Sequence, residues 1–312
     1  MPRSPVFVAG MPRSGTTLLS TMLDAHPTIS IAPETHFFTK SPSALASASA
    51  QSRDETIDFF RAEPGVQDMG LSAEEWRTIR TLAGPEARPV NLFAALIRTY
   101  AARSGADVWG EKTPDHLAYV PDMAETFPQA VFVVITRDPR DVYLSQQSMT
   151  WNRDTIVETA WTWRRYAEHT ERYRSRYAGR FVDVRYEDLV HAPKSVLSEI
   201  CTLLEVPFEA GMLSFHERAA DALSAEPWKT KSRKPVDPSN TQKWRGRLSP
   251  ARQWITQFVA GRAMHAFGYP TPPIKMGATF WTDALHVLKE SVHVVASRRA
   301  QKHGITVPPP KR

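Results

Sequence analysis

A glycine-rich loop between an apolar run and a helical pattern constrains this chain more than any other feature. The stretch "VFVAGMPRSGTTLLSTMLDAHP" covers residues 6–27, and its apolar residues 6–9 predict a buried strand that ends at Gly10. From Thr16 the apolar residues recur at helical spacing until a His-Pro pair at residues 26–27 ends the helix. A loop of this kind presents backbone N–H groups to an anion at a helix N-terminus.

The loop departs from the pattern of nucleotide hydrolases at one position. Gly10 and Gly15 have the spacing of a phosphate-binding loop, but Thr16 occupies the place of the Walker lysine. This weakens the case for hydrolysis of ATP or GTP with magnesium. A fixed positive charge comes from Arg13, and hydroxyl donors come from the neighbouring positions. We therefore expect an anion to bind Arg13, Ser14, Gly15, Thr16 and Thr17. The alternative is a tight strand–helix turn without a ligand.

Strand and helix patterns alternate along the rest of the chain. Residues 130–136, "AVFVVIT", are apolar throughout, as in a central parallel strand. A helix opens at Asp138-Pro139, another strand starts at Phe181, and a helix follows over residues 192–206. The alternation predicts an α/β fold of the P-loop-like, three-layer type, with a central parallel sheet and a C-terminal helix. On a long helix at 155–177 we expect core positions for Trp161, Trp163 and Tyr166.

The sequence predicts two parts. Residues 1–270 form the α/β domain, with a mobile insertion at about 41–100 that begins in a Ser/Ala-rich segment. Residues 271–312 form an amphipathic helix and a tail. The helix is expected from about Thr279 to Arg299, and it carries Phe280, Trp281, Leu285, Leu288, Val292 and Val295. It packs against its own domain, docks peripherally on a membrane surface or forms a homodimer, and the pattern leaves these three open.

Composition excludes several classes of protein. The formal net charge of +6 suits an anionic ligand, but no helix carries an unbroken basic stripe, which disfavours nucleic acid. The single cysteine, Cys201, excludes an intrachain disulfide and a cysteine metal cluster. No apolar run approaches the ~18 residues of a membrane span, and the start is too polar for a signal peptide, so we expect a cytoplasmic protein.

A second candidate anion site lies in "TRDPRDVYLSQQ". Arg137 follows the most apolar strand, at the end where open α/β sheets bind their ligands. Ser145 lies two helical turns further on, so both side chains could converge on one phosphate, which an arginine fork binds well. The alternative is a capping salt bridge at the start of the helix.

Together these motifs resemble a known family. "MPRSGTTLL" with "LDAHP", then "ITRDPRDVYLS", then "RYEDL" is similar in order and spacing to the sulfotransferases that use 3′-phosphoadenosine 5′-phosphosulfate (PAPS). The resemblance extends from residue 6 to about 250, and the run through "APETH" is similar to the tyrosylprotein sulfotransferases. It implies that the first loop binds the 5′-phosphosulfate, that Arg137 and Ser145 bind the 3′-phosphate, and that the product PAP forms without a metal.

The resemblance also implies catalytic roles. Glu34 matches the general base of the tyrosylprotein enzymes, with His36 as the rival base and a helix-capping surface carboxylate as the alternative for Glu34. In "VWGEKTPDH", Lys112 is expected on a turn, where it stabilises charge on the leaving 5′-phosphate together with Arg13. The alternative for Lys112 is a solvated pair with Glu111.

Two further positions are implied for the nucleotide. Tyr186, in "VRYEDL", matches a nucleotide-contacting tyrosine, although it could serve only to anchor the strand end. In the late basic segment, "KPVDPSNTQKW" resembles a segment that closes over the nucleotide, which points to Lys234 and also to Ser232.

The resulting prediction is transfer of a sulfuryl group from PAPS to an acceptor hydroxyl, or less favourably an amine, by in-line displacement. The acceptor remains open between carbohydrate, peptide, lipid and metabolite. Two other functions remain: a nucleotide or small-molecule kinase on a degenerate P-loop, and a non-catalytic anion-binding module. Binding of a 3′-phosphate, which ATP lacks, distinguishes a PAPS-dependent sulfotransferase from a kinase.

Overall fold

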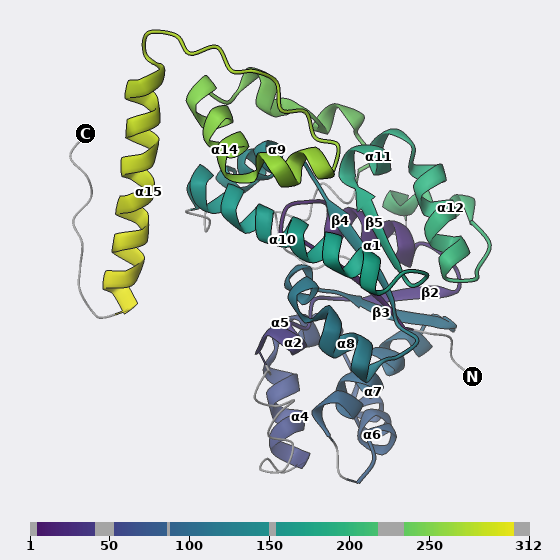
Figure 1. Cartoon of the computed structure of the whole chain (residues 1–312). Helices are drawn as coiled ribbons and strands as arrows, with labels where there is room; N and C mark the ends of the chain where they lie inside the picture. Colours follow the sequence, from purple (N-terminus) through teal and green to yellow (C-terminus); the bar gives the residue numbers. More distant parts are fainter. Residues whose placement is uncertain (1–4, 41–52, 86–87, 150–153, 218–233, 303–312) are drawn as a thin grey trace. The chain divides into compact units, whose positions relative to one another are not determined.

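The computed structural model describes residues 5–40, 53–85, 88–149, 154–217 and 234–302 (Figure 1). Its packing divides into two compact units. The first unit takes residues 1–136 and 172–237, and the second takes residues 137–171 and 238–312. The predicted limit at residue 270 falls inside the second unit. Ser232 lies outside the described residues.

The first unit contains the predicted parallel sheet. Its five strands are ordered β2-β3-β1-β4-β5, and all neighbouring pairs are parallel. The strands are β1 (Val6–Gly10), β2 (Ile29–Ala32), β3 (Val108–Lys112), β4 (Val131–Thr136) and β5 (Phe181–Arg185). The α/β prediction is therefore confirmed. Strand β3 was not predicted, because its sequence "VWGEK" is too short and too polar to show a strand pattern.

One face of the sheet packs on two helices of the first unit. Val6 and Val8 point to this face, where they share a buried cluster with Leu19 of α1 (Thr16–Asp24) and Ile200 of α12 (Pro193–Leu203). Cys201 is buried in the same cluster, and burial raises the pKa of its thiol to about 11. It is a small apolar core residue at neutral pH.

The opposite face is aromatic, because successive strand residues point to opposite sides. The Phe7 ring lies 5.6 Å from that of Phe127, 6.0 Å from that of Phe132 and 6.4 Å from that of Phe93. Phe93 belongs to α7 (Pro89–Ala102), so helices cover the sheet on both faces (Figure 1). This is the three-layer arrangement that the alternating pattern predicts.

The segment expected as an insertion at about 41–100 is helical in its described part. It contains α4 (Arg53–Ala62), α5 (Pro64–Gln67), α6 (Ala73–Leu82) and α7, and Phe60, Ile79 and Leu96 on these helices are buried. Further described helices of the first unit are α2 (Phe37–Lys40), α8 (Val120–Thr126), α11 (Tyr186–His191) and two short 3₁₀ helices at Pro114–Tyr119 and Ala210–Met212.

The second unit is built from helices. They are α9 (Pro139–Gln147), α10 (Ile156–Arg176), which ends in the first unit, α14 (Pro250–Ala266), α15 (Phe280–Lys302) and short 3₁₀ helices at Pro238–Asn240 and Lys243–Gly246. Trp163 is buried against Phe267 and Tyr269. The predicted core position of Trp161 is wrong, since its side chain is 47% exposed. Residues two apart on a helix point in nearly opposite directions, so Trp161 and Trp163 do not share a face.

Helix α15 matches the predicted C-terminal helix, and of the apolar residues named on it only Phe280 is buried among the described side chains. Its buried stripe is Phe280, Ala284 and Val287, which join apolar clusters within the second unit. Four other apolar residues that the sequence analysis named on this helix, Trp281, Leu285, Leu288 and Val292, are exposed. The described part of the chain contains no helix with both the length and the apolarity needed to cross a bilayer.

Candidate active site

The loop after β1 depends on glycine at two positions. Gly10 has φ 146°, Gly15 has φ 103°, and between them Arg13 has φ 74°, a left-handed value that is uncommon for a residue with a side chain. A Cβ on Gly10 would lie 2.3 Å from the Ile135 carbonyl oxygen, and one on Gly15 would lie 2.5 Å from Cδ2 of Tyr186. Both positions therefore require glycine for conformation and for space.

The start of α1 has the properties of an anion site. Its N-cap, Gly15, supplies no side-chain hydrogen bond, and its first turn holds no acidic residue. The first N–H groups of a helix have no partner within the helix, so they can bind an anion here. Ser14 is fully buried beside them, and its Oγ has no hydrogen-bond partner among the described residues. A buried hydroxyl without a partner is costly, which fits a site that a phosphate-like group completes.

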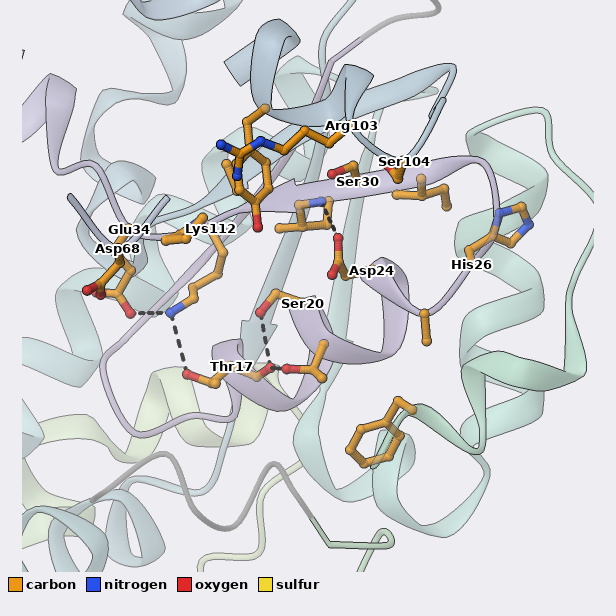
Figure 2. A pocket seen from close by; sticks show the side chains of 18 of the residues that line it. Thr17, Ser20, Asp24, His26, Ser30, Glu34, Asp68, Arg103, Ser104 and Lys112 are labelled. Atoms are coloured by element: carbon orange, nitrogen blue, oxygen red, sulfur yellow. Dashed lines mark hydrogen bonds and ion pairs between the residues drawn. The ribbon is translucent and has the colours of Figure 1, made fainter. Parts of the chain in front are cut away.

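Lys112 and Glu34 lie together next to this loop. The Lys112 ammonium donates to Glu34 Oε1 and lies 3.4 Å from the Thr17 Oγ1 (Figure 2). Lys112 is the last residue of β3 and is buried, so its predicted position on a turn is wrong. Glu34 follows β2, and its side chain is only 25% exposed, which argues against a surface carboxylate that merely caps a helix. Three elements thus converge on one point.

The alternative pairing of Lys112 with Glu111 is also wrong, because neighbours on a strand point to opposite faces. Lys112 is in register with Val8 and lies on the side of α1, whereas Glu111 is in register with Phe7 on the aromatic side. Glu111 is completely buried there. Its Oε1 accepts hydrogen bonds from the backbone N–H and the hydroxyl of Thr35, each 2.8 Å long.

Glu111 and His116 anchor the segment that carries Glu34. His116 Nδ1 lies 3.2 Å from Glu111 Oε2, while its Nε2 accepts a 3.2 Å hydrogen bond from the Phe38 backbone N–H. Complete burial acts to raise the pKa of Glu111, but His116 and the hydrogen bonds from Thr113 and Thr35 outweigh it and hold the pKa below its ordinary value. The carboxylate therefore fixes residues 35–38 against β3 and the turn after it.

His36 stands on the other side of Glu34. Its Nε2 lies 3.5 Å from Glu34 Oε2, and its φ of 53° is left-handed. The hydrogen bond to Glu34 raises the pKa of His36 above its ordinary value of 6.5, although partial burial acts in the opposite direction. Both residues expected to compete as the base are thus in contact, and Glu34 alone of the two also contacts Lys112.

A cavity of about 600 Å³ opens beside this pair. Helix α1 lines it with a polar stripe at helical spacing, and the edge strand β2 lines it along its length. Figure 2 shows Glu34, Lys112 and Thr17 on one side of the cavity and Asp24 and His26 on the other. The lining residues are Thr17, Ser20, Thr21, Asp24, Ala25, His26, Pro27, Ile29–Glu34, Asp68, Tyr100, Arg103, Ser104, Lys112 and Phe215.

Arg137 and Ser145 belong to the second unit. Arg137 directly follows β4 and is buried, and its Nη2 donates a 2.6 Å hydrogen bond to the Asn240 carbonyl. The Ser145 carbonyl accepts a hydrogen bond from Ser148. The capping interaction expected for this motif exists, but Arg140 makes it: its Nε donates to Asp138 Oδ1 at 2.9 Å.

Tyr186 and Lys234 differ in their surroundings. The Tyr186 ring is buried against Gly15 of the loop, whereas Lys234 is exposed. Sequence reasoning missed Glu111 and His116 as supports of the site, although both stand in "VWGEKTPDH" near Lys112.

Within the described ranges, no three His, Cys, Asp or Glu side chains gather closely enough to hold a metal ion.

Comparisons with known proteins show which family this chain resembles. Residues 5–210 match the family model described as the sulfotransferase family. Protein-tyrosine sulfotransferase 1 of Danio rerio is 26% identical over 256 residues, which cover 78% of this chain and 66% of that protein. Protein-tyrosine sulfotransferase 2 of Gallus gallus is 27% identical over 225 residues, covering 68% of this chain and 54% of that protein.

A solved structure shares the fold. The sulfotransferase domain of the olefin synthase from Synechococcus PCC 7002 superposes with a TM-score of 0.63 at 24% identity. The match covers 86% of this chain and 96% of that domain. The chain spans between about half and two-thirds of the length of the two curated relatives named above.

Proposed function

This chain belongs to the sulfotransferase family, and we propose that it transfers a sulfuryl group from PAPS to an acceptor hydroxyl. The observation that carries the proposal is the convergence of an anion-binding loop with the Glu34–Lys112 pair. The loop without a Walker lysine suits a sulfuryl group, which carries less negative charge than a phosphoryl group. Backbone N–H groups and cationic side chains can balance that charge.

The donor would bind through its two phosphate ends. For the 5′-phosphosulfate we propose the residues of the loop: Arg13, Ser14, Gly15, Thr16 and Thr17. The unsatisfied Ser14 hydroxyl and the uncapped start of α1 support this assignment. For the 3′-phosphate we propose Arg137 and Ser145, and for the rest of the nucleotide Tyr186 and Lys234, all four by resemblance to the family. The buried contact of Tyr186 with Gly15 favours its part in this set.

For the chemistry, we propose that Glu34 is the general base. The acceptor oxygen attacks the sulfur, the bond from sulfur to the bridging oxygen breaks in line, and PAP leaves with the electron pair. Glu34 takes the acceptor proton as attack proceeds. Lys112 and Arg13 stabilise the negative charge that grows on the leaving 5′-phosphate. The pairing of Lys112 with both Glu34 and Thr17 supports this division of roles, because one ammonium lies beside the base and the loop.

His36 is the alternative base. Its contact with Glu34 raises its pKa, so a larger fraction of it is protonated near neutral pH than of an ordinary histidine. A protonated imidazole cannot accept a proton, which favours Glu34. We assign to His36 the role of holding the Glu34 carboxylate from the side opposite Lys112.

The experiment that tests the proposal compares ligands and then measures transfer. Adenosine 3′,5′-bisphosphate at 100 times its dissociation constant should stabilise the protein by ~2.7 kcal/mol, and ATP with magnesium should not. Incubation with sulfur-labelled PAPS and a panel of phenols, glycans, peptides and lipids should label an acceptor. Stabilisation by ATP with magnesium and none by the bisphosphate would favour a kinase. Binding of the bisphosphate without any transfer would favour the non-catalytic anion-binding module.

A further inference from the structure

The cavity beside the Glu34–Lys112 pair has a charge pattern that narrows the acceptor class. We infer that this cavity is the acceptor subsite and that it selects neutral or cationic hydroxyl compounds against anionic ones. The inference rests on the proposed sulfotransferase function, which it deepens by naming the chemistry of the acceptor. The notable contrast is with the chain as a whole, whose net charge of +6 would suggest an acidic partner.

The first argument is the position of the cavity relative to the proposed catalytic residues. The cavity contains the proposed base and the proposed leaving-group cation in its own lining, so a hydroxyl bound there would meet both. Its volume of about 600 Å³ is in the range of pockets that enclose a small organic molecule. It extends away from Glu34 and Lys112 along α1 to Asp24 and His26, which gives the body of an acceptor a place to lie (Figure 2).

Carboxylates stand at both ends of the lining, with Asp68 drawn beside Glu34 and Asp24 further along α1 (Figure 2). Asp24 and Asp68 both line the cavity. Asp24 Oδ1 accepts a 2.7 Å hydrogen bond from the Ile31 backbone N–H, and this bond holds the carboxylate at the edge of β2. Glu34 is also in the lining, at the reacting end, but Lys112 balances its charge, so Asp24 and Asp68 are the carboxylates that carry the argument. An anionic acceptor would therefore bring its charge close to fixed negative groups.

The cations of the lining are committed to acceptors of the protein itself. Lys112 is paired with Glu34. Arg103 donates from Nη1 to the Met69 carbonyl at 2.6 Å and from Nη2 to the Gly70 carbonyl at 2.9 Å. It also forms an ion pair with Glu75, and this contact is the main reason that the pKa of Glu75 falls to about 2. The Arg103 charge is thus balanced within the protein.

Local charge outweighs net charge for a bound molecule. At physiological salt, exposed charges further away than about 8 Å are largely screened, so distant lysines and arginines contribute little inside the cavity. Like charges at close range oppose binding and act chiefly on specificity. The donor adds further negative charge when it occupies the loop. All three considerations act against an anionic acceptor and none acts against a neutral or cationic one.

The test uses three phenols of matched shape: tyramine, 4-propylphenol and 3-(4-hydroxyphenyl)propanoate. Each is titrated by calorimetry into the full chain saturated with adenosine 3′,5′-bisphosphate. We expect tyramine to bind at least as tightly as the neutral phenol, and the carboxylate to bind about tenfold more weakly than tyramine. In the variant carrying Asp24→Asn and Asp68→Asn, this ratio should shrink about threefold or more, because both acidic charges are removed.

A matched control keeps the result interpretable. Asp24→Asn preserves the oxygen that accepts from Ile31, so the edge of β2 retains its hydrogen bond. Asp58→Asn removes one exposed carboxylate of α4 outside the lining and should leave the ratio unchanged. Carboxylate binding as tight as that of tyramine, or no binding by any of the three phenols, overturns the inference. The bisphosphate itself is titrated into the protein before the phenols. If it does not bind, the result refutes the proposed function and not the inference about the acceptor.

Discussion

At the scale of single residues, the ion pair between Glu34 and Lys112 joins segments 78 positions apart in the chain. A glutamate and a lysine are common residue types and do not by themselves indicate a site. Their meaning comes from position: one follows the edge strand β2, the other ends β3, and both lie beside the first turn of α1. Parallel strands end at the same edge of a sheet, so their last side chains meet there.

Replacing the base should separate binding from chemistry. We expect Glu34→Gln to lower kcat by about 10²–10⁴-fold, because proton transfer in the transition state is lost. The amide keeps the size of the side chain and an oxygen that Lys112 can contact. Affinity for adenosine 3′,5′-bisphosphate, measured by calorimetry, should stay within about threefold of the parent value. An unchanged kcat would move the base to His36 or to solvent.

His36 should make stability depend on pH. Its folded pKa is raised by Glu34, so its stabilisation is complete below the unfolded value of 6.5 and is lost as the pH rises through the folded pKa. We expect His36→Asn, in which asparagine tolerates the left-handed backbone, to destabilise the protein more at about pH 5.5 than at about pH 8.5. Urea denaturation at both pH values measures this. In a Glu34→Gln background the difference should shrink, because Glu34 is the largest cause of the raised pKa of His36. Equal losses at both pH values in the parent background would contradict it.

At the scale of elements, the loop after β1 and the segment after β2 are both held by specific packing. The loop is closed by two glycines in contact with β4 and α11. The segment 35–38 is held by the buried carboxylate of Glu111 on β3. Each element therefore depends on a residue far from it in sequence. A change in either support should therefore alter the position of the Glu34–Lys112 pair.

A prediction for the loop compares alanine substitutions at two glycines of similar backbone conformation. Gly15 and Gly179 both have positive φ, 103° and 85°, but a Cβ on Gly179 meets no atom within 4 Å. Gly15→Ala should weaken bisphosphate binding by about tenfold or more, because the new methyl group displaces Tyr186 and shifts the loop N–H groups. Gly179→Ala carries the conformational cost alone and should leave binding unchanged. Similar binding losses in the two variants would contradict the role of the Tyr186 contact.

The Glu111 support should matter for stability. Glu111→Gln removes the charge that accepts from Thr35 and Thr113 and places an amide N–H₂ group against donors. We expect a loss of about 1–3 kcal/mol in the free energy of unfolding, the usual consequence of an unsatisfied buried polar group. Urea denaturation measures it, with Glu125→Gln on the exposed side of α8 as a near-neutral control. A loss no greater than that of the control would show that the buried charge is dispensable.

At the scale of the whole molecule, the residues proposed for the 3′-phosphate, Arg137 and Ser145, belong to the second compact unit. Arg137 is the first residue of that unit. We expect Arg137→Ala to weaken binding of adenosine 3′,5′-bisphosphate by about 10- to 100-fold, the effect of losing a hydrogen bond to a charged group. Binding of adenosine 5′-phosphosulfate, which has no 3′-phosphate, should change little. Equal losses for both ligands would assign Arg137 to the fold, through its bond to Asn240.

Much of the fold was predictable because its signals are local. The run at 131–136 is apolar enough to be a central strand wherever it is placed, and Gly10 and Gly15 mark their loop by spacing alone. Helix α15 was also predicted, but its buried face was not. Both of its stripes are apolar, and only contact with neighbouring clusters decides that Phe280 is buried while Trp281 is exposed.

The sequence by itself determined the strand–loop–helix unit and the alternation of strands and helices, since these depend on backbone preferences and the periods of side chains along the chain. It also determined the family, through motifs whose order and spacing resemble the sulfotransferases. Only the tertiary structure decided that Lys112 meets Glu34 while its neighbour Glu111 turns to Thr35, and that the cavity beside them is lined by acidic groups. The reason is physical. Local rules act over a few residues, whereas charge pairing and cavities arise from side chains that the folded sheet brings together from distant positions.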